Sequence, residues 1–200
     1  MKYIFIAGAP GSKWSSVARN IYFSPSIDRS DSNAQRQYEL TGHCGAYWDP
    51  GMEFDVPEDL STLTPAQAEQ LWNAPFSGSG CRIVKSHIFC YRKNIDYLRA
   101  HWPASPIVLV HRPDDACVGW WVRSGGFAIT YPNYAPYYQD LDTMCDRVSK
   151  QNHGLLSAWY DYNGAEPSTN RDLARMLALE PPPLNHVQDY PSNDIKVKVI

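Results

Sequence analysis

Residues 2–16 read Lys2-Tyr3-Ile4-Phe5-Ile6-Ala7-Gly8-Ala9-Pro10-Gly11-Ser12-Lys13-Trp14-Ser15-Ser16, an apolar run that leads into a turn of Gly, Pro, Ser and Lys. The apolar run predicts a buried strand, and the helical spacing of Val17, Ala18 and Ile21 predicts a helix after the turn. A strand, a glycine-containing turn and a helix N-terminus in this order present backbone N–H groups to an anion. The stretch therefore predicts a phosphate-binding loop, with an ordinary turn between a strand and a helix as the alternative.

The residue types of the loop suit a phosphate group. Glycine lets the backbone approach the anion, and Lys13 adds a mobile positive charge. The residues that we expect around the phosphate are Gly8, Pro10, Gly11, Ser12, Lys13, Trp14, Ser15 and Ser16. Their order differs from a regular P-loop and looks like an adenylate-kinase loop with one residue missing, which argues against a regular Mg·ATP site.

Composition narrows the class of protein. The chain has 200 residues, of which 44% are hydrophobic and 20% charged, as expected of a single globular domain over 1–200. A net charge of -3 gives no reason to expect a nucleic acid or a membrane surface as a partner. No run has the length of a membrane span, and the N-terminus does not resemble a signal peptide. The five cysteines are widely spaced and predict no disulfide framework, which favours a cytoplasmic location.

Two further short stretches, at 81–86 and 106–111, predict two more strands. Residues 106–111 form an apolar run that is too continuous for a half-exposed sheet, so this stretch predicts a buried parallel strand. Helices are expected directly after the loop, over 65–73, over about 92–101, from Asp114 or Asp115 through Val122, over 140–161, and from Ser168 or Thr169 through Leu177. This alternation predicts an α/β fold of three layers, in which a mostly parallel, doubly wound β-sheet is flanked by helices.

Two segments lack a clear periodic pattern. Residues 24–60 are rich in Ser, Asp, Pro and Gly, and they predict a loop-rich insertion with one short helix. The insertion is long for a structureless connection, which favours a functional wall or lid. Residues 181–200 predict an irregular tail.

Charged residues follow each of the three predicted strands. Lys13 follows the first strand, Lys85 and His87 follow the second, and Arg112 follows the third. Because ligands of parallel sheets bind beyond the carboxyl ends of the strands, we expect these residues to form an electropositive pocket with a candidate general base. A structural role for His87 and a solvated Lys85 are the alternatives. Arg112 is alternatively an ion-pair partner of Asp115.

These motifs resemble those of the sulfotransferases that use 3′-phosphoadenosine 5′-phosphosulfate. Members have a Pro-Lys-Ser-Gly-Thr-like loop after the first strand, similar to residues 10–15 here. They often have Lys-Thr-His after the second strand, similar to Lys85-Ser86-His87. An Arg-Asn-Pro-x-Asp segment after the third strand opens a helix and holds the 3′-phosphate, and residues 110–121 are similar to it. The resemblance covers about residues 2–22 and 82–124.

The resemblance implies a fold of the type shared by P-loop nucleoside triphosphatases and sulfotransferases. It also implies sulfuryl transfer from that donor to a hydroxyl of a small-molecule, glycan or peptide acceptor, with adenosine 3′,5′-bisphosphate as product. His87 would be the general base, and Lys13 and Lys85 would stabilise the transferring group. Arg112, Arg123 and Ser124 would hold the 3′-phosphate. No metal is expected, because lysines can cover the single charge of the sulfuryl group.

Three positions depart from the family pattern. The family's loop lysine falls at Gly11, its arginine falls at His111, and its helix serine falls at Gly119. Lys13 would have to replace the family's loop lysine from two residues later, and Arg112 its arginine from one residue later. Arg123, about one helical turn beyond Gly119, would have to supply the contact of the missing serine. Two other functions therefore stay open, namely a P-loop kinase of a nucleoside or small metabolite and a non-catalytic nucleotide-binding module.

Overall fold

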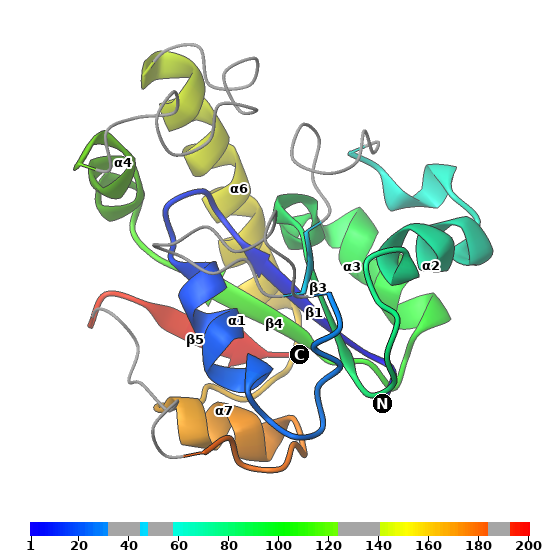
Figure 1. Ribbon diagram of the computed structural model, residues 1–200. Helices are drawn as coiled ribbons and strands as arrows, with labels where there is room; N and C mark the ends of the chain where they lie inside the picture. The colour runs from blue at the N-terminus through cyan, green and yellow to red at the C-terminus, as the bar shows by residue number, and fades with distance from the viewer. Residues whose placement is uncertain (32–44, 48–57, 124–140, 184–192) are drawn as a thin grey trace.

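The computed structural model of the chain describes residues 1–31, 45–47, 58–123, 141–183 and 193–200, which form an α/β fold around one five-stranded sheet (Figure 1). The strand order is β2-β3-β1-β4-β5. The strands are β1 (Tyr3–Gly8), β2 (Ala46–Tyr47), β3 (Arg82–Lys85), β4 (Ile107–His111) and β5 (Lys196–Val199). The three strands predicted from the sequence are thus the three central strands of the sheet.

The sheet is mixed. Strands β2, β3, β1 and β4 run parallel to one another, and β5 pairs antiparallel with β4. The prediction of a mostly parallel sheet is therefore confirmed for these four strands only. The irregular tail predicted for 181–200 is wrong over Lys196–Val199, which pairs with β4 and places the buried Val197 opposite Val110. A Lys-Val-Lys-Val run of four residues is too short to indicate a strand by its pattern alone.

The helices in the described part of the chain are α1 (Trp14–Tyr22), α2 (Pro65–Asn73), α3 (Arg92–His101), α4 (Asp114–Arg123), α6 (Leu141–Asp161) and α7 (Asn170–Met176), with 3-10 turns η1 (Leu60–Thr62) and η2 (His87–Cys90). Their bounds agree with the predicted helices to within about one residue. At α2 the sequence signal was strongest, because Thr64 and Gln67 form a capping box and Pro65 occupies the first turn. None of the described helices is both long and apolar enough to cross a membrane.

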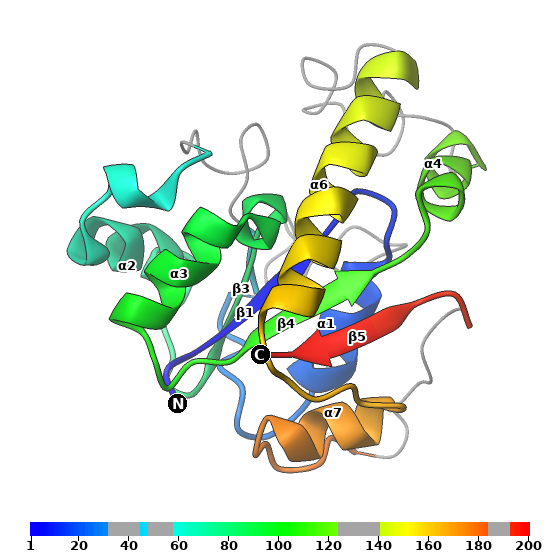
Figure 2. The same cartoon turned by 180° about the vertical axis from the view of Figure 1, so that it is seen from behind.

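Alternating side chains divide the core between the two faces of the sheet. Tyr3 and Phe5 of β1 pack with α2, α3 and α6, whereas Ile4 and Ile6 pack with α1 and α7. Figure 1 shows α1 on the near face of the sheet, and Figure 2 shows α3 and α6 on the other face. Burial of both faces explains the continuous apolar runs of β1 and β4. This arrangement is compatible with the predicted three layers.

The predicted insertion at 24–60 is described only in part. It contributes β2, which pairs with β3, and the start of η1. Residues 32–44 and 48–57 lie outside the described residues, as do 124–140 and 184–192. The prediction of a wall or lid in this segment falls on those residues and stays a prediction.

Candidate functional site

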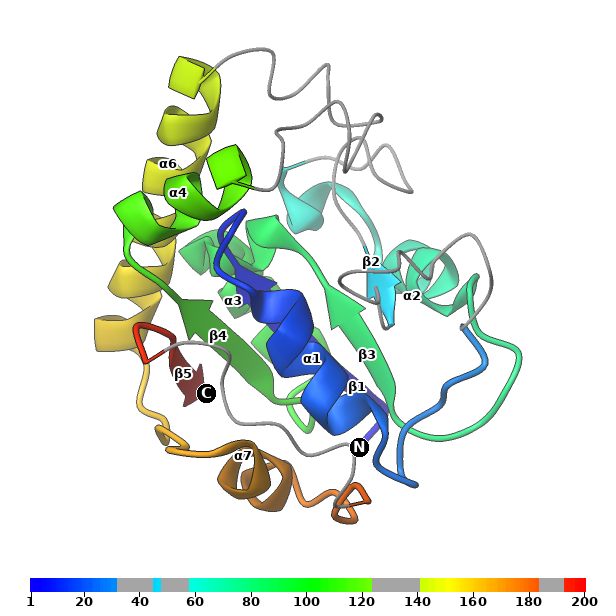
Figure 3. The same ribbon diagram turned by 60° about the vertical axis from the view of Figure 1, so that its left-hand side comes forward.

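The ends of three neighbouring strands meet at one edge of the sheet. The order β3-β1-β4 brings together the residues that follow Lys85, Gly8 and His111. Figure 3 shows these ends side by side, with α4 and part of α6 next to them. The predicted convergence at the carboxyl edge is therefore present in the fold.

The loop between β1 and α1 is tightly folded. Gly11 has a φ of 80° and Lys13 a φ of 61°, and both values lie in the left-handed region. For Lys13 this conformation is strained, and strained backbone is typical of functional loops. Lys13 is the N-cap residue of α1, and its side chain makes no capping hydrogen bond. The Ser12 N–H donates to the Ala9 carbonyl (3.0 Å). The Ser12 amide, which was predicted to bind an anion, is therefore paired within the loop.

Gly8 and Ser12 pack closely inside the loop. A Cβ on Gly8 would come within 2.7 Å of Ser12 Oγ and of Trp14 Cβ, so only glycine fits there. Ser12 is fully buried, and its hydroxyl has no hydrogen-bond partner among the described residues. A buried hydroxyl without a partner costs about 1–3 kcal/mol. A bound oxyanion in the loop would supply the missing partner.

Lys13 belongs to a cluster of cations. Burial lowers the pKa of Lys13 below its ordinary value, and the charges of Arg112 and Arg123 lower it further, while Asp194 opposes them. Arg123 is the last residue of α4, and a Cβ on Gly119 would lie 3.5 Å from its Nη1. Arg123 therefore lies over the position where the sulfotransferase pattern has a serine. Ser124 lies outside the described residues.

Arg112 connects the end of β4 to the loop between β1 and α1. Its side chain is buried, with Nη1 donating to the Gly11 carbonyl (3.2 Å) and Nε donating to Asp194 Oδ2 (3.0 Å). The acidic partner of Arg112 is thus Asp194, and the predicted alternative of a pair with Asp115 is wrong. The Arg112 carbonyl accepts a hydrogen bond from Asn152 Nδ2 (2.8 Å), which fixes the backbone at this point.

Lys85 and His87 lie on the other side of the loop. Lys85 is fully buried at the end of β3, so the solvated strand-end alternative is wrong. His87 opens η2, where its Nδ1 hydrogen-bonds with the Gly8 carbonyl and its ring lies 4.5 Å from that of Trp14. A carbonyl only accepts, so Nδ1 carries the proton and Nε2 the lone pair. The histidine therefore has a structural contact to the loop as well as a basic nitrogen.

Burial decides the protonation of His87. It lowers the pKa of His87 to about 3, and the charges of Arg147 and Lys85 act in the same direction, while the hydrogen bond to the Gly8 carbonyl opposes the shift. At neutral pH the imidazole is neutral. It can accept a proton, but only once something stabilises its charged form.

Sequence reasoning missed three residues at this edge, namely Arg147, Asn152 and Asp194. Arg147 and Asn152 belong to α6, whose side facing η2, α4 and β4 is partly polar. The available signal was the pair Gln151 and Asn152, which interrupts the apolar stripe of the predicted helix between Val148 and Leu155, where apolar residues are usual. Asp194 carried no signal, since only the antiparallel pairing of β5 brings it to this edge.

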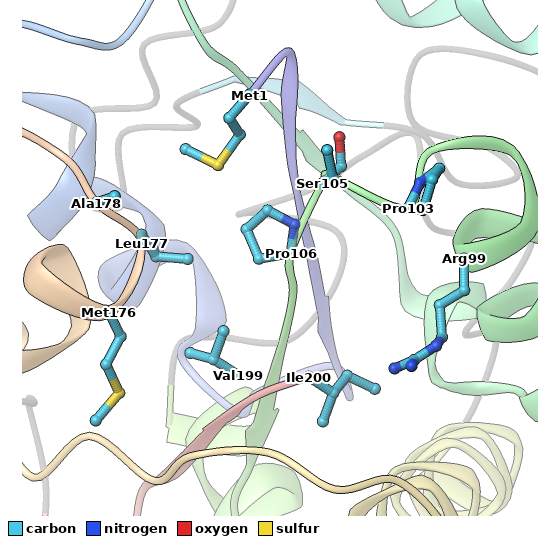
Figure 4. Close-up of a pocket in the computed structure, with 11 residues that line it drawn as sticks. Met1, Arg99, Pro103, Ser105, Pro106, Met176, Leu177, Ala178, Val199 and Ile200 are labelled. Carbon is cyan, nitrogen blue, oxygen red and sulfur yellow. The ribbon is translucent and has the colours of Figure 1, made fainter.

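A separate groove lies at the opposite edge of the sheet, beside the start of β1 and β4 (Figure 4). It has a volume of about 660 Å³ and no predicted site residue lines it. Met1, Pro106 and Met176 contribute to its mostly apolar walls. The groove is therefore distinct from the charged edge.

The charged edge combines cations from three strand ends with a neutral imidazole. Such a set can hold an anionic group, stabilise negative charge that develops on it and accept a proton from a neighbouring hydroxyl. Comparison of the chain with protein-family models, with curated proteins and with solved structures found no match in any of the three.

Proposed function

We propose that the chain is a sulfotransferase-like enzyme with a P-loop type of fold, which transfers a sulfuryl group from 3′-phosphoadenosine 5′-phosphosulfate to an acceptor hydroxyl. One observation carries the proposal. The three motifs that resemble the sulfotransferase family follow β3, β1 and β4, and these strands are neighbours in the sheet. The turns after parallel strands share the carboxyl edge in any such sheet, so the support comes from the residues that these turns carry. Lys13, the Lys85-Ser86-His87 segment and Arg112 each belong to one of the three motifs, and all of them follow strands at the edge where parallel sheets bind ligands.

The donor would bind across the loop and the end of β4. The 5′-phosphosulfate would lie against α1 and the loop, where the buried Ser12 hydroxyl has no partner among the described residues and Lys13 offers a charge. Arg112 and Arg123 would take the 3′-phosphate, because a guanidinium binds a phosphate through two parallel hydrogen bonds.

The transfer step needs a base and a charge-stabilising pair. His87 Nε2 would accept the hydroxyl proton as the acceptor oxygen bonds to sulfur. The bond between sulfur and the phosphate oxygen breaks at the same time, and adenosine 3′,5′-bisphosphate leaves. Lys13 and Lys85 would stabilise the charge on the transferring and leaving oxygens. An anion bound beside the ring favours its charged form, so donor binding would raise the pKa of His87 from about 3.

Thermal unfolding with different nucleotides tests the proposal. Adenosine 3′,5′-bisphosphate at a hundred times its dissociation constant should add about 2.7 kcal/mol to the free energy of unfolding. Adenosine 5′-phosphate should add less at the same concentration, because it lacks the 3′-phosphate. Stabilisation by Mg·ATP alone would indicate a kinase, and stabilisation by none of the three would contradict nucleotide binding.

A non-catalytic nucleotide-binding module is the second candidate. The observation that favours it is the burial of His87, which makes the free protein a weak base. Tight binding of adenosine 3′,5′-bisphosphate without release of that product from the donor, in the presence of varied hydroxyl acceptors, would support this second candidate over the first.

A further inference from the structure

The antiparallel direction of β5 brings an acidic residue to the charged edge. Lys196, the first residue of β5, pairs with His111, the last residue of β4. Asn193 and Asp194 form a turn before β5 and therefore lie beyond the carboxyl end of β4. In Figure 3 the start of β5 lies beside that end. A strand parallel to β4 would have carried this residue to the opposite edge.

Asp194 faces two of the cations that we expect to bind the anion. Its Oδ2 accepts a hydrogen bond from Arg112 Nε at 3.0 Å. Its charge also opposes the lowering of the Lys13 pKa. The Arg112 side chain is 7% exposed, whereas that of Asp194 is 32% exposed. The arginine is thus buried, and Asp194 is the more exposed member of the pair.

We infer that Asp194 is an internal counter-anion, which holds the anion-binding position of Arg112 in the unliganded chain and competes with an incoming phosphate or sulfate group. A buried guanidinium without a counter-charge is costly, so a carboxylate keeps Arg112 in place until a ligand arrives. Arg112 Nη1 also donates a hydrogen bond to the Gly11 carbonyl. This bond keeps Arg112 against the loop when the ligand replaces Asp194 as the partner of Nε. Two anions on one guanidinium edge repel each other, so the carboxylate must move away as the ligand binds.

The inference rests on the proposed function, because it assumes that this edge binds an anion. Asp194→Asn removes the negative charge and keeps the size of the side chain. We expect this variant to bind adenosine 3′,5′-bisphosphate on the order of tenfold more tightly in titration calorimetry, which corresponds to about 1.4 kcal/mol. Asp146→Asn is the matched control, because Asp146 is an exposed acid on α6 and its substitution changes the net charge equally. The control should bind within about twofold of the wild-type protein.

Each outcome of the calorimetry decides a separate point. If the wild-type protein binds the nucleotide and Asp194→Asn binds it equally well or more weakly, Asp194 is not a counter-anion that competes with the ligand. The proposed function is then unaffected. Binding by neither protein overturns both. Binding by Asp194→Asn alone supports both, with strong competition in the wild-type chain. Asp194→Ser serves as a second uncharged variant, with the same expected gain, if the asparagine variant does not fold.

Discussion

At the scale of single residues, His87 has two separable tasks. Its Nδ1 contacts the Gly8 carbonyl, and its Nε2 is the proposed base. An asparagine amide nitrogen lies close to the position of Nδ1, so His87→Asn keeps a donor for Gly8 and removes the base. We expect adenosine 3′,5′-bisphosphate binding to stay within about twofold, and turnover to fall by about 10²–10⁴.

The contrast between binding and turnover makes this test specific. Loss of both in His87→Asn would indicate that the ring only shapes the loop. Full turnover with an identified acceptor would exclude His87 as the base. His111 would then be the next candidate, since it is the other histidine at a strand end of this edge.

Burial of His87 also predicts how stability depends on pH. Its pKa is about 3 in the folded chain and about 6.5 when unfolded, so the unfolded state binds more protons between these values. The free energy of unfolding should therefore fall as the pH decreases from about 6.5 towards 3, by at most about 1.4 kcal/mol per pH unit from this group. Urea unfolding of wild-type protein and His87→Asn between about pH 4 and pH 7 measures the difference. Parallel curves for the two proteins would show that His87 does not carry this dependence.

At the scale of elements, the loop between β1 and α1 depends on the absence of a side chain at Gly8. Gly8→Ala would place a Cβ 2.7 Å from Ser12 Oγ and Trp14 Cβ. We expect a loss of about 1–3 kcal/mol in the free energy of unfolding and weaker nucleotide binding, because the loop must shift. Gly119→Ala in α4 is the control, since its nearest new contact is 3.5 Å. That change should be neutral or stabilising by up to about 1 kcal/mol. Equal melting temperatures for the two variants would contradict the tight loop.

Much of the element structure follows from local sequence. Residues 65–73 carry their own cap at Thr64, and 106–111 form an apolar run that only a buried strand explains. Lys196–Val199 could not be recognised, because its pairing with β4 is set by tertiary contacts and not by its pattern. The partner of Arg112 could not be predicted for the same reason. The residues that directly follow a strand can be predicted from the sequence. A residue that reaches the same edge from an antiparallel neighbouring strand cannot be predicted in this way.

At the scale of the whole molecule, α6 connects the site to the rest of the core. One side of it packs Leu155, Ala158 and Trp159 against the sheet. Nearer its start, Asn152 Nδ2 donates to the Arg112 carbonyl (2.8 Å) and to Asp114 Oδ1 (2.6 Å). The position of Arg112 is therefore set from outside its own strand and loop. A substitution in α6 that removes this contact should therefore alter nucleotide binding, because it releases the backbone that positions Arg112.

Asn152→Leu tests this connection, because leucine has a similar size and no donor. We expect a loss of about 1–3 kcal/mol in the free energy of unfolding, since the buried Arg112 carbonyl loses a partner. His153→Ala is the control, because His153 is the exposed neighbour of Asn152. If Arg112 reads the 3′-phosphate, Asn152→Leu should weaken adenosine 3′,5′-bisphosphate binding more than adenosine 5′-phosphate binding. An equal loss for both nucleotides would mean that Asn152 stabilises the fold without positioning Arg112, because only a displaced guanidinium distinguishes ligands that differ by one phosphate.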